Sequence, residues 1–335
     1  MKSFIRSLLF VAAATTAMPA VSADNGEIVV YSARKEHLIK PLFDAYTKKT
    51  GVEVKYVTDK AGPLLARLKA EGANTPADML ITVDAGNLWH AAERGVLAEV
   101  NSAALQSNVP AHLRDPNNRW FGLSVRARTV VYSTERVKPE ELTSYEDLAD
   151  PKWKGRLCLR TSKKVYNQSL VAMMMERLGK EKAEEVVKGW VANLAVPPFS
   201  NDTKTMKAVA AGQCDVAVVN TYYFGRLQKK EPDVKLALFW PNQNDRGVHV
   251  NVSGAGITKH AKNAKAATDL LVWLSSDEAQ QMFAGLNMEY PANGSVKADP
   301  MVAAWGSFKG DEGNIAKAGE LQAEAVMLMD RAGYR

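Results

Sequence analysis

The feature that most limits how this chain can fold is a repeated alternation between short β-branched runs and helical patterns. Residues 27–31 form an apolar, β-branched run, and residues 52–57 alternate apolar with polar side chains. Between these runs, Leu38, Leu42 and Tyr46 recur at every fourth position, as they do on one face of a helix. Strands that alternate with helices are typical of βαβ units and parallel sheets. The sequence therefore predicts an α/β fold.

Two long extended segments divide the chain into groups of alternating elements. Residues 125–132 and 248–257 both have an extended, β-rich pattern, and further strands and helices are predicted on either side of them. If both segments cross between lobes, the fold has two lobes, and each lobe is a mixed, mostly parallel sheet flanked by helices. The predicted parts are lobe 1 at 24–126 and 251–301, lobe 2 at 127–250, and C-terminal helices that pack across the lobes at 302–335.

The first 23 residues have the composition of a secretory signal peptide. A basic start is followed by the apolar stretch 7–14, and Val21 and Ala23 occupy the −3 and −1 positions of a cleavage site. The apolar stretch is too short to span a bilayer of ~30 Å, and no cysteine near the cleavage site offers a point for lipid attachment. The sequence therefore predicts cleavage after Ala23 and export to a soluble compartment.

Charge and motif content narrow the classes of function. The net charge of +6 is interspersed along the chain, so nothing in it requires a nucleic acid partner. No GxSxG motif, phosphate-binding loop or GxGxxG motif occurs, and the five histidines have no metal-binding spacing. Two classes remain, a binding protein and an exported hydrolase whose motif is not recognisable. The lack of a nucleophile–base signature favours binding.

The chain contains two cysteines, Cys158 and Cys214, and neither belongs to a CxxC motif. In an exported protein, an even pair of this kind is typical of a disulfide. Two buried free thiols are the alternative that the residues alone leave open.

Polar side chains are predicted where ligands of open α/β sheets bind, beyond the carboxyl ends of strands. Tyr166 begins a predicted helix, while Tyr222 and Tyr223 follow a predicted strand. A phenolate oxygen is a hard anionic ligand that suits a hard trication, but from the pattern alone ordinary half-buried aromatic packing is the commoner explanation of such tyrosines. Arg34 lies where the first helix is predicted to begin, and Arg126 lies on an extended segment. Either arginine could bind an anion or form a surface ion pair.

With these residues in place, the chain resembles the periplasmic ferric-ion-binding proteins of ABC transporters, in the branch that has a tyrosine-rich site. The most specific signal is the Tyr-Tyr pair combined with an upstream Tyr-Asn and a Tyr-Ser-x-Arg start. The resemblance covers essentially the whole chain after the signal peptide. It is carried by residues 30–34, 76–78, 82–84, 120–123, 126–128, 153–155, 162–167, 220–223, 251–254 and 286–291.

This resemblance implies a two-lobed periplasmic binding protein fold of type II and a function in transport rather than catalysis. It implies that Tyr166, Tyr222 and Tyr223 bind Fe³⁺ as phenolates. Arg34 and Arg126 would hold a synergistic anion such as carbonate, or would surround the metal ligands. The protein would act in the periplasm as a monomer that delivers iron to an inner-membrane ABC permease. The resemblance also implies a disulfide between the two cysteines.

The chain departs from one subgroup of this family, in which a histidine-tyrosine pair follows the first arginine. Lys35 and Glu36 occupy those positions here, so a fourth phenolate ligand is not expected from this loop. Water, the anion, Glu36 or His37 would then complete the coordination of the metal. The same residues also fit a binding protein for a small anionic organic solute, with the arginines on its acid group and the tyrosines stacked against it.

Overall fold

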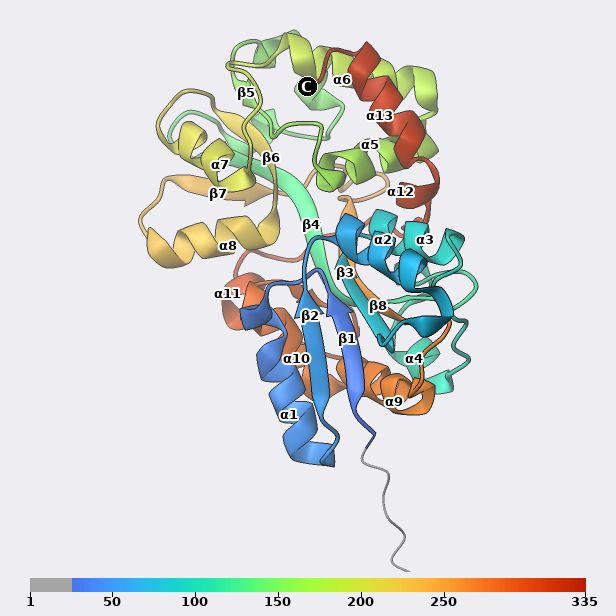
Figure 1. Cartoon of the computed structure of the whole chain (residues 1–335). Helices are drawn as coiled ribbons and strands as arrows, with labels where there is room; N and C mark the ends of the chain where they lie inside the picture. Colours follow the sequence, from blue (N-terminus) through green and yellow to red (C-terminus); the bar gives the residue numbers. More distant parts are fainter. Residues whose placement is uncertain (1–25) are drawn as a thin grey trace, which may run out of the picture.

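The computed structural model describes residues 26–335, so the predicted signal peptide and its cleavage site lie outside the described residues. Figure 1 shows two lobes with the long strand β4 (Phe121–Ser133) running from one to the other. The predicted two-lobed α/β architecture is confirmed. Within residues 26–335, no helix combines the length and apolar character needed to span a membrane.

The sheet of lobe 1 is built around β1 (Ile28–Ser32). This strand pairs in parallel with β2 (Val54–Thr58) on one side and with β3 (Met79–Val83) on the other. The strand β8 (Val250–Ile257) then pairs antiparallel with β3. Helices flank this sheet, namely α1 (Lys40–Thr50), α2 (Ala61–Glu71), α3 (Ala85–Glu93), α4 (Ala103–Asn108), α9 (Ala264–Ser275) and α10 (Asp277–Asn287).

The strand β4 belongs to both lobes. Its residues 121–127 pair antiparallel with β8, and its residues 128–132 pair antiparallel with β6 (Val216–Asn220). Every residue of β4 is buried, including Arg126 and Arg128, because the strand is covered on both faces. This strand and β8 correspond to the two extended segments predicted from the sequence.

Lobe 2 contains the remaining strands and the predicted disulfide. β5 (Leu157–Cys158) pairs in parallel with β6, while β7 (Leu236–Phe239) pairs antiparallel with β4. The bond between Cys158 and Cys214 is present, which confirms the prediction. Four helices complete the lobe, α5 (Val165–Leu178), α6 (Lys180–Ala192), α7 (Asp202–Ala210) and α8 (Thr221–Lys230).

The prediction that each sheet is mostly parallel was wrong. The parallel pairings are β1–β2, β1–β3 and β5–β6, whereas every pairing of β4 and β8 is antiparallel. These two long strands pass between the lobes in opposite directions. Each sheet is therefore completed by strands that arrive antiparallel to its βαβ units.

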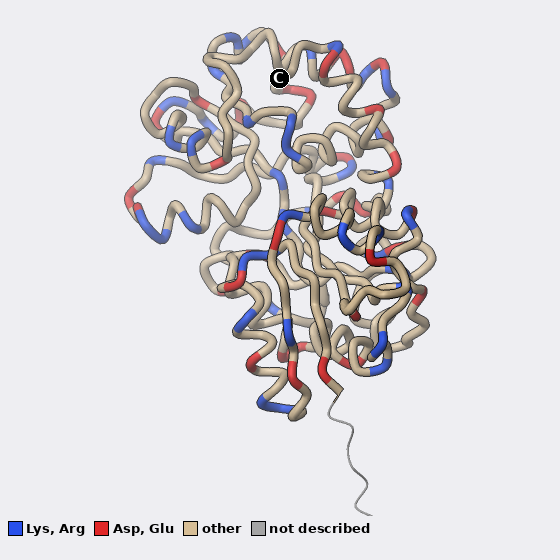
Figure 2. Tube along the Cα trace, in the orientation of Figure 1, with Lys and Arg blue, Asp and Glu red and all other residues tan. Residues whose placement is uncertain are grey.

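The last part of the chain returns to both lobes. β9 (Tyr290–Pro291) pairs with β4, and α11 (Pro300–Ala303) follows it. α12 (Lys317–Glu320) contacts α3 of lobe 1 and α5 of lobe 2, and α13 (Gln322–Arg331) packs on α5 and α6. Figure 2 shows basic and acidic residues interspersed over both lobes, which agrees with the charge pattern of the sequence.

Candidate metal and anion site

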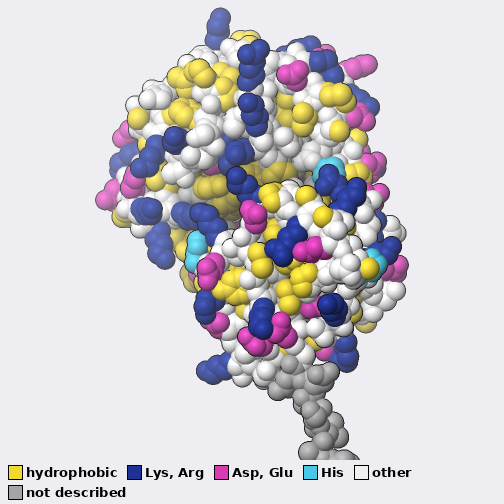
Figure 3. Space-filling view, in the orientation of Figure 1, with side chains coloured by type: hydrophobic (Ala, Val, Ile, Leu, Met, Phe, Trp, Pro, Cys, Tyr) yellow, Lys and Arg dark blue, Asp and Glu magenta, His cyan; other side chains and the backbone are white. Residues whose placement is uncertain are grey.

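A pocket of about 150 Å³ lies where the two lobes face each other. Figure 3 shows one face of the molecule hollowed between the lobes, with lysine and arginine side chains around the hollow. Most of the residues that line the pocket are polar, and they come from both lobes. They include Arg34, Lys35, Arg126, Tyr166, Tyr222, Tyr223, Arg226, Ser253, Asn287 and Glu289.

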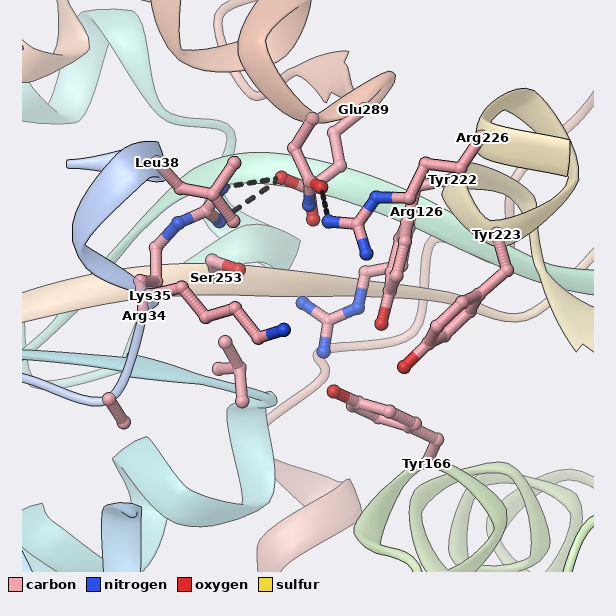
Figure 4. Close-up of a pocket in the computed structure, with 13 residues that line it drawn as sticks. Arg34, Lys35, Leu38, Arg126, Tyr166, Tyr222, Tyr223, Arg226, Ser253 and Glu289 are labelled. Atoms are coloured by element: carbon pink, nitrogen blue, oxygen red, sulfur yellow. Dashed lines mark hydrogen bonds and ion pairs between the residues drawn. The ribbon is translucent and has the colours of Figure 1, made fainter. Parts of the chain in front are cut away.

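The structure brings the three predicted tyrosines together. Tyr166 lies in the first turn of α5, and Tyr222 and Tyr223 lie in the first turn of α8, which begins directly where β6 ends. The rings of Tyr222 and Tyr223 have centroids 4.4 Å apart. Figure 4 shows the hydroxyl groups of all three directed into one space. A side chain at Gly225 would come within 2.9 Å of the Trp305 ring, so this glycine allows the close packing that holds α8 in place.

Burial keeps at least two of these phenols neutral in the free protein. Removal from water raises the pKa of Tyr166 and raises that of Tyr222 well above the usual value, and the neighbouring Tyr223 raises both pKa values further. The amide Nδ2 of Asn220 donates to the Tyr222 hydroxyl oxygen over 3.3 Å. Neutral phenols can be buried together without charge repulsion, and they become anionic donors when a cation replaces their protons.

Beneath the phenols, lobe 2 contains a buried charged network. The guanidinium carbon of Arg160 lies 5.3 Å from the ring centre of Tyr166 and 5.9 Å from that of Tyr223. Its Nη1 is 3.4 Å from Asp202, which also pairs with Arg128 at 3.2 Å. A fixed positive charge is therefore close to two of the three rings.

Arg126 offers hydrogen-bond donors that no described residue uses. Its side chain is 3% exposed, and neither Nη1 nor Nη2 has a hydrogen-bond partner among residues 26–335. Nη2 lies 3.6 Å from Oδ2 of Asp84, which is close enough for charge pairing. Figure 4 shows the guanidinium directed into the pocket beside Tyr166. Two buried, unused N–H donors of this kind match the geometry of a bidentate anion.

Asp84 caps the helix α3 and also joins the two lobes. Its carboxylate accepts from the backbone N–H of Gly86 at 3.0 Å. It also accepts from the hydroxyl of Ser169 on α5 at 2.6 Å and from the Asn251 amide at 3.1 Å. Burial raises the pKa of Asp84, and the charge of Arg126 opposes that shift. The backbone φ of 77° is strained for a non-glycine residue, as is common at functional sites.

Arg34 lines the pocket, and both of its Nη atoms are already engaged, whereas its Nε has no hydrogen-bond partner among residues 26–335. Nη1 and Nη2 both donate to Oε2 of Glu289, over 3.1 and 3.0 Å, and the Ser124 hydroxyl donates to the same oxygen over 3.0 Å. The side chains of Arg34 and Glu289 are 1% and 2% exposed. The predicted anion-binding role of Arg34 stays a prediction, since an anion here would compete with a buried carboxylate.

Glu36 and His37, the predicted additional ligands, do not line the pocket. Both are exposed residues of the 3₁₀ turn Glu36–Leu38, and Glu36 accepts a hydrogen bond from the Tyr56 hydroxyl at 2.9 Å. Sequence reasoning did not find Arg226 or Glu289. The position of Arg226, one helical turn after Tyr222, could have indicated it, because residues four apart share a helix face. Glu289 had no comparable signal, since its partner Arg34 is distant in sequence.

Comparison with known proteins places the chain among transport proteins. Residues 41–310 match the family model described as bacterial extracellular solute-binding protein. The chain is 44% identical over 318 residues to iron uptake protein A1 of Synechocystis sp.. This match covers 93% of this chain and 88% of that protein.

Solved structures give the same result. The chain matches Trichodesmium IdiA (FutA), described as in complex with iron and citrate ligands, with a TM-score of 0.90 and 46% identity over 92% of this chain and 100% of that one. It matches ferric iron-binding protein A of Mannheimia haemolytica in an open conformation with a TM-score of 0.87 and 36% identity, over 92% and 98% of the two chains. The chain therefore belongs to the bacterial extracellular solute-binding protein family, together with these iron uptake and ferric-ion-binding proteins.

Proposed function

We propose that this protein binds ferric iron in the periplasm and delivers it, as a monomer, to an inner-membrane ABC permease. The observation that carries this proposal is the convergence of three tyrosine hydroxyls from two helices of lobe 2 on one pocket. The relatives support it, because they include an iron uptake protein and a protein named as an Fe(3+)-binding periplasmic protein from Serratia marcescens. The relatives are named as binding and uptake proteins, which agrees with a function in transport.

The donor set suits Fe³⁺ in both hardness and charge. Tyr166, Tyr222 and Tyr223 would bind as phenolates, and three phenolates balance the charge of a trication. Residues 26–335 contain no group of three histidine, cysteine, aspartate or glutamate side chains that could hold a metal ion. The tyrosines are therefore the metal donors that this pocket can offer.

An anion would complete the coordination from the other side of the pocket. The unused N–H groups of Arg126 are the best-placed donors for it, with Arg34 as the second candidate. Carbonate and citrate both have the oxygen geometry that a guanidinium binds in a bidentate manner. Closure of the two lobes about β4 and β8 would enclose the metal, as in other hinged binding proteins.

Titration of the metal-free protein with ferric ion in bicarbonate buffer tests this function. We expect one equivalent of iron to produce a visible phenolate-to-iron charge-transfer band. A protein that binds small organic acids but gives no colour with iron would instead be a binding protein for an anionic solute. Turnover of ester or amide substrates would favour a hydrolase.

A further inference from the structure

The loop that leads into Tyr166 has little packing of its own. Residues 161–164 connect Arg160 to the start of α5, and they are half-buried or exposed. A second pocket, of about 590 Å³, adjoins this loop and is lined by Ser162 of the loop and by Tyr334 of the C-terminal tail, among others. Because side chains that border open space lack packing partners there, hydrogen bonds must do much to fix the position of the loop.

The tail and the first turn of α5 share one hydrogen-bond acceptor at the start of this loop. The Tyr334 hydroxyl donates to the backbone oxygen of Arg160 over 2.5 Å. The same oxygen accepts from the side-chain amide of Asn167 over 2.8 Å. Asn167 follows Tyr166 directly in the first turn of α5. The contact made by Tyr334 is therefore one hydrogen bond away from the residue next to Tyr166.

α13 packs on α5, and its end directs Tyr334 into lobe 2 (Figure 1). Gly333 follows the helix with a φ of 76°, and the N–H of Tyr334 donates to the carbonyl of Met329 over 2.9 Å. This is a Schellman C-cap, which glycine favours because it has no Cβ. The reversed chain buries the Tyr334 side chain and brings the Arg335 backbone oxygen within 3.3 Å of the Ser162 nitrogen. The tail therefore meets the loop at two points.

Arg160 connects the tail to two of the phenols. Its guanidinium carbon lies 5.3 Å from the ring centre of Tyr166 and 5.9 Å from that of Tyr223. Its Nη1 is 3.4 Å from Asp202, and its buried Nε has no hydrogen-bond partner among residues 26–335. A shift of the Arg160 backbone would move a charged group that contacts both rings. It would also disturb the Asn167 amide beside Tyr166.

We propose that Tyr334 is a positioning residue for the ferric site, and that it acts through the Arg160 backbone oxygen to fix where the Tyr166 hydroxyl lies. This inference rests on the proposed ferric-ion function. Tyr334 does not line the pocket between the lobes, so its effect on iron is indirect. Groups that hold metal ligands in place commonly change metal affinity by about 10–100-fold when they are removed.

The variant Tyr334→Phe tests this role, because it keeps the buried ring and deletes only the hydroxyl that donates to Arg160. We expect iron affinity in bicarbonate buffer to fall by roughly tenfold, the lower end of the range for a group that supports a metal ligand. The charge-transfer band should also shift, because its energy depends on the geometry between iron and phenolate. In the metal-free protein, the backbone amides of residues 161–168 should exchange hydrogen faster than in the parent.

Two control variants separate positioning from a general weakening of lobe 2. Arg331→Gln removes the 2.7 Å ion pair with Glu184 that holds α13 against α6, and it leaves the contact with Arg160 in place. Tyr132→Phe deletes the hydroxyl of another buried tyrosine of lobe 2. Both controls should keep the parental iron affinity and the parental position of the band.

The outcomes separate this inference from the function on which it rests. If the parent shows the charge-transfer band, and Tyr334→Phe has the same band and affinity, Tyr334 is not a positioning residue and the ferric function stands. If Arg331→Gln reproduces the loss of affinity and the shift, the effect is one of tail docking in general, and the inference also fails. If the parent itself gives no colour with iron, the ferric function is wrong, and this inference falls with it.

Discussion

The two walls of the pocket hold their polar groups in different ways. On the wall from lobe 2, Tyr166 and Tyr222 are buried as neutral phenols beside Tyr223. On the wall from lobe 1, the Arg34 guanidinium is buried with the Glu289 carboxylate already bound to it. A neutral hydroxyl can be buried in the free protein at a modest cost in free energy, whereas a buried charge requires a partner of opposite charge. The phenol wall is therefore suited to a cation, and the charged wall to an exchange of anions.

A fall in pH should have the largest effect on iron affinity, because protons compete with iron for the phenol oxygens of the lobe 2 wall. The free phenols are protonated at neutral pH, since burial raises the pKa of Tyr166 and Tyr222 above the usual value of ~10. Each phenol that binds iron must release its proton, so affinity should fall as the pH falls, by up to about a thousandfold per pH unit for three protons. The number of protons released for each iron bound, measured in a pH-stat, checks how many phenols bind as phenolates. A release below one proton per iron would contradict phenolate ligation.

Removal of two phenol oxygens should have the next largest effect. The double variant Tyr222→Phe, Tyr223→Phe keeps the ring packing and deletes two donors. We expect loss of the charge-transfer colour and a fall in iron affinity beyond the ~100-fold that loss of a single supporting contact causes at metal sites. The variant Tyr46→Phe, a buried ring of lobe 1, is the control and should bind iron normally. Parental affinity and colour in the double variant would remove the tyrosines from the site.

The disulfide should stabilise the part of lobe 2 that carries the tyrosines. Cys158 and Cys214 are 56 residues apart and lie in the same buried cluster as Phe224 of α8, against which Tyr223 packs. A loop of this length predicts that the bond contributes about 4 kcal/mol to the free energy of unfolding. Reduction should lower the denaturant midpoint accordingly, and thiol labelling of the denatured, unreduced protein should find no free cysteine. Two labelled thiols would refute the pairing in the exported protein.

On the charged wall, Asp84→Asn should destabilise the free protein by about 3 kcal/mol, because it leaves the Arg126 guanidinium buried without a countercharge. Added ferric ion with bicarbonate should recover part of this loss, since the anion supplies the missing charge. The control Asp78→Asn also changes a buried carboxylate, but one that accepts from the backbone of Val29 and Asn263. Its loss should not be recovered by iron. Equal recovery in the two variants, measured by thermal unfolding, would remove Arg126 from the anion site.

The sequence predicted the phenol wall better than the charged wall, for a physical reason. Tyr222 follows β6 directly, and strand ends can be read from local pattern. The pairs Arg34–Glu289 and Arg126–Asp84 join residues far apart in sequence, and no local pattern reports such contacts. The same limit explains the error in the sheets. The hydrophobic pattern of a long strand indicates burial, but it does not indicate the direction in which the strand meets its neighbours.

The smallest effect on iron affinity should come from changing Arg34. Variants at this residue distinguish a structural role on the charged wall from a role in anion binding. Both Nη atoms already donate to Glu289, and Nε has no hydrogen-bond partner among residues 26–335, so we expect an anion to gain one contact, from Nε. Arg34→Ala should lower iron affinity in bicarbonate by about 1.5 kcal/mol, the lower end of the range for one charged hydrogen bond. It also leaves Glu289 buried and unpaired, which would weaken the fold and complicate the measurement.

The double variant Arg34→Gln, Glu289→Gln removes both charges and avoids that penalty. If the double variant shows the same loss of affinity with bicarbonate present, and no loss relative to the parent without it, Arg34 binds the anion. If its affinity equals that of the parent in both buffers, Arg34 serves only to neutralise Glu289, and the anion site is limited to the side of the pocket that carries Arg126.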